Sequence, residues 1–148
     1  DYQGCLGSGG GMTALFDAAC DGLDALNDYS KNLYNGDFRA NGIVVVITDG
    51  CDNQSKFTCS DVKGSLERIN QDEKLESLVT ILVGVNVNDS TVANSLRSFY
   101  NDSGIREYVE LDNANANTLA KLARFVSKSI AAQSQALGTG GASQPINF

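Results

Sequence analysis

The chain has 148 residues, 42% hydrophobic and 20% charged, which is ordinary for one globular domain with a sizeable core. Its 11 basic and 18 acidic residues give a net charge of −7, which argues against nucleic acid or an anionic membrane as the partner. No stretch approaches the roughly 20 apolar residues that a membrane span needs. The lack of histidine excludes a His-based triad and a Cys/His zinc site within these residues.

The first half of the chain predicts a loop, a long helix and a buried strand. Residues 1–12 are rich in glycine and lack periodicity, so a loop is expected there. From Thr13 apolar residues recur at helical spacing, which predicts a helix over 13–34 that ends at Asn35-Gly36. The run Ile-Val-Val-Val-Ile at 43–47 predicts a strand buried on both faces, the central strand of a parallel sheet.

The second half alternates helices and strands. The expected elements are a short helix over 62–69 that starts near Ser60 or Asp61, a strand over 78–85, a helix over 92–99 capped by Asp89 or Ser90, a strand over 107–111 and a helix over 119–130. This alternation predicts an α/β fold, a Rossmann-like parallel sheet flanked by helices. Residues 1–134 are taken as the domain and 135–148 as a Gly/Ser-rich tail, either flexible or lying on a surface.

The four cysteines, at positions 5, 20, 51 and 59, form no CxxC pair. They are interpreted as reduced, partly buried residues, with a disulfide between Cys51 and Cys59 left open. This use of cysteine favours an intracellular or virion-type setting over an extracellular one.

Two motifs combine into a candidate site. The segment GGGMTAL, with Thr13 inside it, lies 36 residues before the Asp49 of VVVITDG. The glycine-rich segment fails as a dinucleotide or phosphate-loop motif, because it lacks the required glycine spacing and any Gly-Lys-Ser/Thr ending. Together, however, the two segments resemble the von Willebrand factor type A domain, also called the integrin inserted-domain fold, over roughly residues 7 to 132.

The resemblance implies a metal-ion-dependent adhesion site. Thr13 and Asp49 would be metal ligands, with Ser8, Gly50 and Asp52 as possible outer residues around them. Oxygen ligands of this kind suit Mg²⁺, or else Mn²⁺ or Ca²⁺. In the family, an Asp or Glu carboxylate of a protein partner completes the coordination, so the implied function is metal-dependent protein–protein binding.

One part of the family pattern is missing. The Asp-x-Ser-x-Ser motif of the family's first strand does not occur here, so the chain resembles the carboxyl half of the domain, without its first strands. That strand would lie beside residues 44–47, and an open apolar edge there is a template for aggregation. Another segment or chain is therefore expected to complete the sheet beside Val44 to Ile47.

The sequence leaves a second class of function open. A structural or assembly subunit, with its metal site incomplete or unused, is the alternative, and the predicted open edge and the tail favour it. An enzyme is not expected, because Cys51 has no base near it in sequence and no phosphate-binding motif is present.

Overall fold

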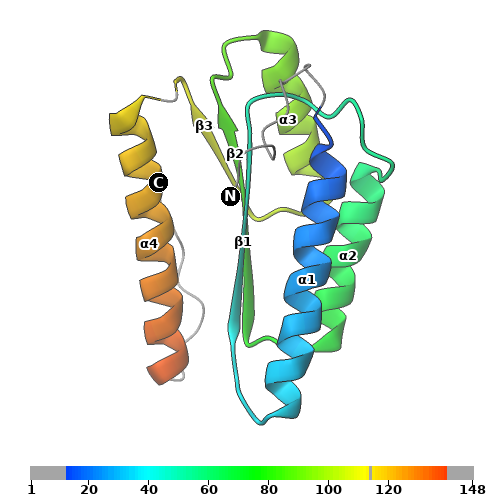
Figure 1. Ribbon diagram of the computed structural model, residues 1–148, viewed down its shortest axis with the longest axis vertical. Helices are drawn as coiled ribbons and strands as arrows, with labels where there is room; N and C mark the ends of the chain where they lie inside the picture. The colour runs from blue at the N-terminus through cyan, green and yellow to red at the C-terminus, as the bar shows by residue number, and fades with distance from the viewer. Residues whose placement is uncertain (1–12, 114, 140–148) are drawn as a thin grey trace, which may run out of the picture.

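The computed structural model describes residues 13–113 and 115–139. Its elements are α1 (Leu15–Asn35), β1 (Asn41–Thr48), α2 (Cys59–Asp72), β2 (Ser77–Val85), α3 (Ser90–Ser103), β3 (Glu107–Leu111) and α4 (Ala116–Thr139). The strands form a parallel sheet in the order β1-β2-β3, with α4 on one face and α1, α2 and α3 on the other (Figure 1). The predicted α/β fold, a parallel sheet flanked by helices, is confirmed.

The central strand is β2 rather than β1. Every residue from Val79 to Val85 is buried, because β2 has a strand on each side and helices on both faces. In β1 most residues are half-buried, and the side chain of Ile47 is 57% exposed. The expected burial of residues 43–47 on both faces is therefore not found within the described chain, whereas the expected open edge beside Val44 to Ile47 is present among the described residues. The physical reason is that β1 pairs only with β2 among the described residues, which leaves its other edge without a strand.

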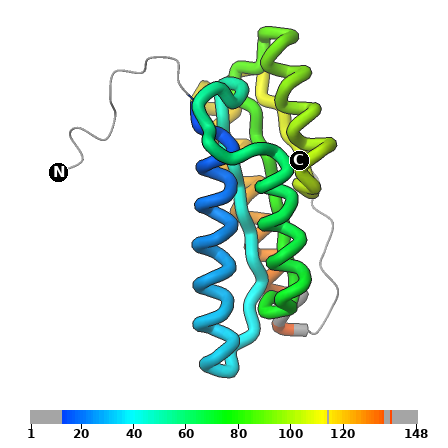
Figure 2. Tube along the Cα trace, turned by 90° about the vertical axis from the view of Figure 1, so that its right-hand side faces the viewer, coloured from blue at the N-terminus to red at the C-terminus, as the bar shows by residue number. Residues whose placement is uncertain are grey.

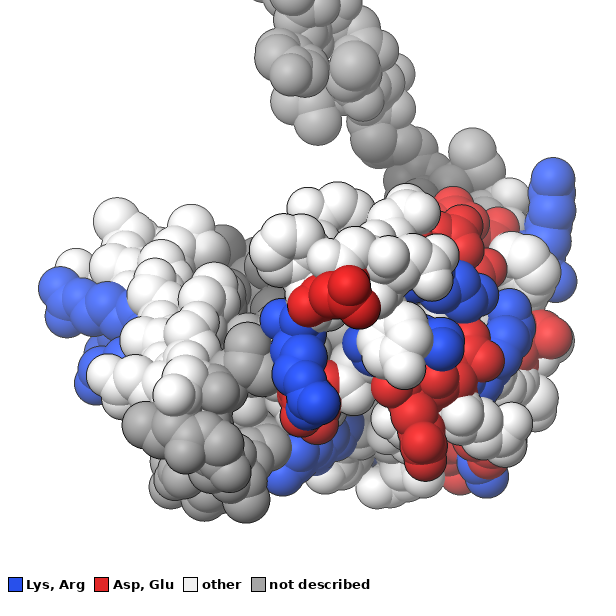
Figure 3. Space-filling view, turned by 90° about the horizontal axis from the view of Figure 1, so that it is seen from below, with Lys and Arg blue, Asp and Glu red and all other residues white. Residues whose placement is uncertain are grey.

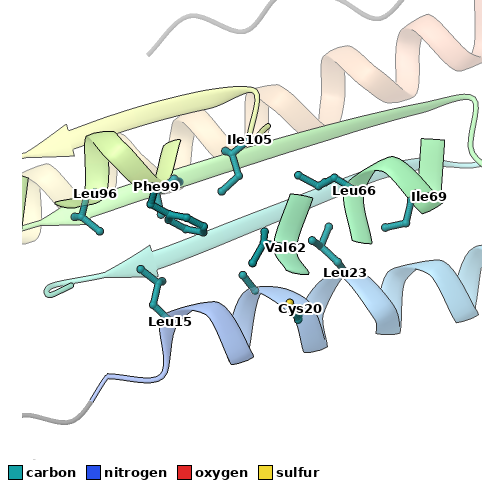
Figure 4. Close-up of a cluster of buried hydrophobic side chains, with 11 residues drawn as sticks. Leu15, Cys20, Leu23, Val62, Leu66, Ile69, Leu96, Phe99 and Ile105 are labelled. Carbon is teal, nitrogen blue, oxygen red and sulfur yellow. The ribbon is translucent and has the colours of Figure 1, made fainter. Parts of the chain in front are cut away.

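The core consists of two apolar clusters separated by the sheet. The first joins α1, α2 and α3 to the sheet, and Figure 4 shows its side chains converging from the three helices; its best-buried members include Val62, Leu82 and Leu96. The second joins α4, through Leu122 and Phe125, to one face of β2 and β3. Alternate residues of β1 face the two clusters, as the period of a strand requires.

Polar side chains fix α4 over the start of β1. The side-chain amide of Asn41 donates to the backbone oxygen of Gln133 at 2.7 Å. The Ser77 hydroxyl donates to Asn41 Oδ1 at 2.9 Å and to Gln133 Oε1 at 3.3 Å. These hydrogen bonds hold the second half of α4 against the start of both β1 and β2. They also satisfy polar atoms of Gln133, which is buried.

The helix ends follow local signals only in part. Asp89 caps α3, as predicted, and accepts the Thr91 N–H at 2.6 Å. In α2 the cap is Thr58, which forms a capping box with Asp61. The last helix runs to Thr139, past the expected end near residue 130 and into the predicted tail from 135. Alanine and glutamine at 131–136 are good helix formers, and they outweigh the neighbouring serines. Residues 140–148 lie outside the described chain.

Charges of both signs alternate at the end of the molecule where β1 begins. Figure 3 shows this end, with blue and red side chains side by side. The described ion pairs on α1 and α2 are Lys31–Asp72 and Arg68–Asp24, and Arg39 pairs with Glu76 nearby. This end therefore presents no surface of a single charge sign. Among the described residues, no helix is both long and apolar enough to cross a membrane.

Candidate metal centre at the carboxyl end of β1

The described part of the first motif segment, from Thr13 onward, is adjacent in space to the loop that follows the second motif segment. After β1 the chain forms a loop that passes the first turn of α1 (Figure 2). The backbone N–H of Thr13 donates to Asn53 Oδ1 at 2.7 Å, and the N–H of Asn53 donates back to Thr13 O at 3.0 Å. The N–H of Gln54 also donates to Thr13 O, at 3.2 Å. Thr13 is therefore fixed against the loop that follows Asp49.

Asp52 caps α1 from across the chain. Its Oδ1 accepts the backbone N–H of Leu15 at 2.8 Å and that of Phe16 at 3.3 Å. The Ser55 hydroxyl donates to the same oxygen. The residue at the N-cap position is Ala14, whose side chain cannot accept a hydrogen bond. Asp52 thus supplies the acceptor that helix N–H groups need, and its negative charge suits the positive end of the helix dipole.

Asp17 fastens the far end of the same loop. Its Oδ1 accepts the backbone N–H groups of Lys56 and Phe57, both at 2.8 Å, and its own N–H donates to Ser55 Oγ at 3.0 Å. Asp17 therefore clamps this loop, so that residues 52–57 are held to α1 at both ends.

The turn between β1 and this loop presents Asp49 to solvent. The Thr48 hydroxyl donates to Gly50 O at 2.8 Å and accepts the Gly50 N–H at 3.2 Å, which fixes the backbone around Asp49. Thr13 Oγ1 lies 3.6 Å from the point where a Cβ on Gly50 would stand. The side chain of Asp49 is exposed, and no hydrogen bond or ion pair of its carboxylate is found within the described chain.

The available ligands are oxygens, which fit a hard divalent cation. Thr13 offers a hydroxyl and Asp49 a carboxylate, at the same end of β1. Gly50 follows Asp49 in the chain and lies near the Thr13 hydroxyl, and Asp52 is occupied as the cap of α1. Ser8 lies outside the described residues. Within the described ranges, no three His, Cys, Asp or Glu side chains are grouped so as to hold a metal ion.

The cysteines near this loop are free thiols. Cys51 and Cys59 do not form the disulfide that the sequence left open, and Cys20 is also free and buried. Burial raises the pKa of the Cys59 thiol above its ordinary value, and the negative charge of Asp102 acts in the same direction. For these three residues the interpretation of reduced cysteines is confirmed, and Cys5 lies outside the described residues.

The Asp17 clamp predicts a pH-dependent contribution to stability. The backbone N–H of Phe57, foremost, holds the pKa of the Asp17 carboxyl below its ordinary value of 3.8, and the N–H of Lys56 acts in the same direction. Because the folded pKa is lowered, this contribution is present above the unfolded pKa and is lost as the pH falls through the folded pKa.

The measurement is urea denaturation of the wild type and of Asp17→Asn at several pH values. We expect the wild type to be the more stable at about pH 6, with the difference shrinking toward about pH 3. An equal difference at every pH would contradict the role of the Asp17 charge. Asp28→Asn, which removes an exposed carboxylate on the same helix, is the matched control.

Sequence reasoning placed Thr13 and Asp49 together but missed the residues that hold them there. Asp52 was expected as an outer residue of the metal site, whereas it accepts the backbone N–H groups of Leu15 and Phe16. Asn53, which belongs to neither motif, accepts the backbone N–H of Thr13. The only sequence signal was a cluster of Asp, Asn, Gln and Ser after a strand, and this is also the usual composition of a loop. Comparison of the chain with protein-family models, with curated proteins and with solved structures gave no match.

Proposed function

We propose that this chain is a protein-binding module whose contact with its partner depends on a divalent cation, most simply Mg²⁺, held at Thr13 and Asp49. The single observation that supports the proposal is the adjacency of the two segments: Thr13 Oγ1 is 3.6 Å from the Cβ position of Gly50, next to the exposed Asp49. Mg²⁺ commonly keeps several waters and takes only one or two carboxylates from the protein. A threonine hydroxyl and one carboxylate therefore suit part of such a site.

The cation would act by attracting an acidic side chain. A bound Mg²⁺ presents positive charge and exchangeable positions to an Asp or Glu of a protein partner. The chain's own part is to orient the two ligands, through the Thr48 hydroxyl on one side and Asn53 on the other. Further oxygen ligands would come from a segment beside the free edge of β1.

The experiment is calorimetric titration of residues 1–148 with Mg²⁺, for the wild type, Thr13→Ala and Asp49→Ala. We expect both substitutions to weaken cation binding, and Asp49→Ala the more, because it removes the only charged ligand. Asp28→Ala removes an exposed carboxylate elsewhere and is the matched control. If Asp49→Ala binds Mg²⁺ as the wild type does, the proposal is wrong, because the cation is then bound elsewhere on the acidic surface.

A second candidate function is that of an assembly subunit in which the cation site is not used. The unpaired edge of β1 favours it, because open edges of this kind are normally covered. The two candidates differ in their response to chelation: EDTA dissociates the partner in the first case and leaves the complex intact in the second.

A further inference from the structure

Two Asn-Gly pairs lie at the two ends of the turn that joins α1 to β1. Asn35 is the last residue of α1 and Gly36 follows it, whereas Asn41 and Gly42 begin β1. The turn is at the lower end of the molecule in Figure 1. An asparagine before a glycine can lose its side-chain amide, because glycine has no Cβ to keep its backbone nitrogen away from that side chain. The two pairs share this local chemistry, so the structure around each pair decides how readily it reacts.

The structure blocks this reaction at Asn41. Its side-chain amide donates to the backbone oxygen of Gln133 at 2.7 Å, and its Oδ1 accepts the Ser77 hydroxyl at 2.9 Å. Gly42 is buried, and a Cβ there would stand only 2.8 Å from a methyl carbon of Leu75. The backbone of both residues is also paired with β2. Moving the Gly42 nitrogen onto the Asn41 side chain would therefore require β1 to separate from α4 and β2.

The side chain of Asn35 has none of these restraints. Asn35 and Gly36 are exposed to solvent, and the Asn35 side chain makes no hydrogen bond within the described chain. The Gly36 N–H donates to Leu33 O at 3.0 Å in the last turn of α1. Helix ends fray easily, whereas a buried strand opens only together with much of the structure. Fraying of this last turn is therefore enough to free the Gly36 nitrogen.

We propose that Asn35 is a site of spontaneous deamidation in the folded protein, whereas Asn41 is protected by the fold. The Gly36 nitrogen attacks Cγ of Asn35, so that a bond between them forms, the bond from Cγ to Nδ2 breaks, and the amide leaves as ammonia with the proton of the Gly36 nitrogen. Water then opens the cyclic imide. Attack of water at Cγ leaves isoaspartate or aspartate according to the bond that breaks: aspartate forms when the bond from Cγ to the Gly36 nitrogen breaks, and isoaspartate forms when water instead attacks the backbone carbonyl carbon.

Either product changes the end of α1. A carboxylate at position 35 adds negative charge at the carboxyl end of the helix, where the dipole is already negative, and close to Asp37 in the chain. Isoaspartate also adds a carbon atom to the main chain. The N–H groups of residues 36–38, directly after it, donate to the backbone oxygens of Leu33 and Tyr34, each at 3.0 Å. Because the added carbon shifts these donors, deamidation loosens the turn between α1 and β1.

The test compares the two asparagines within one chain. Residues 1–148 are incubated with EDTA in mildly alkaline buffer, once folded and once in concentrated urea, and mass spectrometry of peptides measures the amide lost at each position. In urea we expect Asn35 and Asn41 to react at similar rates, because the fold is absent. In the folded protein we expect Asn35 to react at least about tenfold faster than Asn41, because the end of α1 opens more readily than β1.

Gly36→Ala is the matched variant. The alanine methyl group shields the attacking nitrogen and leaves Asn35 in place. It is tolerated because Gly36 has an ordinary φ of −93° and the atom nearest to its Cβ position, at 3.2 Å, belongs to the exposed ring of Phe38, which can move. We expect this variant to deamidate more slowly at Asn35. Hydrogen exchange at the Asp37 and Phe38 amides should become faster in incubated wild type and stay unchanged in incubated Gly36→Ala.

Three results would overturn the proposal. The first is that the two asparagines react at the same rate in the folded protein, whether fast or slow. The second is that Asn41 reacts faster than Asn35. The third is that the two rates differ as much in urea as in the folded protein, which would place the cause in the local sequence and not in the fold. If Asn35 deamidates and hydrogen exchange in the turn does not change, the loosening of the turn is wrong.

Discussion

Replacing Leu82 with alanine will lower the free energy of unfolding by about 3–5 kcal/mol. Leu82 lies in the central strand β2, is fully buried, and packs in the cluster that joins the sheet to α1, α2 and α3. The substitution removes apolar contacts and leaves a cavity that the packed side chains of the cluster close only in part. Urea denaturation followed by circular dichroism measures the effect.

The control removes the same atoms from a different environment. Leu119→Ala truncates a leucine that is 44% exposed on α4, so we expect a loss below about 1 kcal/mol. Similar losses for Leu82→Ala and Leu119→Ala would contradict the described core. Equal losses would mean that Leu119 on α4 is as deeply buried as Leu82.

Replacing Asp52 with alanine will lower the free energy of unfolding by about 2 kcal/mol. Its Oδ1 accepts two backbone N–H groups at the start of α1 and the Ser55 hydroxyl, so its loss leaves these donors without their acceptor. The same substitution should weaken Mg²⁺ binding, because it releases the loop that follows Asp49 from the start of α1. Denaturation and calorimetry on one variant measure both effects.

Asp52→Asn separates the cap from the charge. The asparagine keeps an oxygen acceptor at the same place, so most of the lost stability should return. If Asp52→Ala is as stable as the wild type, the start of α1 does not depend on this contact. If Asp52→Asn is as damaging as Asp52→Ala, the hydrogen bonds matter less than the interaction of the carboxylate charge with the helix.

The strands were well predicted because their signals are local. The run at 43–47 and the run at 78–85 are apolar and β-branched between turn residues, and each is a strand in the structure. The range 107–111 matches β3. The local sequence of these segments favours a strand and no other structure, so it agrees with the conformation that the tertiary contacts require.

The position of β1 in the sheet was harder to predict. An apolar run predicts that a strand is buried but does not show which elements bury it. Within the described chain, most residues of β1 are only half-buried. Ile47, which the apolar run predicts to be buried and which is exposed in the structure, shows this most clearly. The helix α4 continues past its expected end near residue 130 because alanine and glutamine at 131–136 favour a helix in spite of the neighbouring serines.

The sequence predicted the two proposed ligands of the candidate site but not the residues that hold them in place. Thr13 and Asp49 belong to motifs that can be recognised one at a time. The cap from Asp52 to Leu15 joins residues 37 positions apart, and no periodicity marks such a contact. Contacts of this kind follow from the complete fold, which a single sequence does not reveal.

The most direct test of the cation proposal is paramagnetic broadening of backbone amide signals by Mn²⁺ in residues 1–148. At low Mn²⁺ we expect the amides of Thr13, Asp49 and Gly50 to broaden first, and excess Mg²⁺ to restore them, because both ions prefer oxygen ligands. Asp49→Ala should abolish this local effect. Broadening centred on other acidic residues, or unchanged by Asp49→Ala, would contradict a metal centre at the carboxyl end of β1.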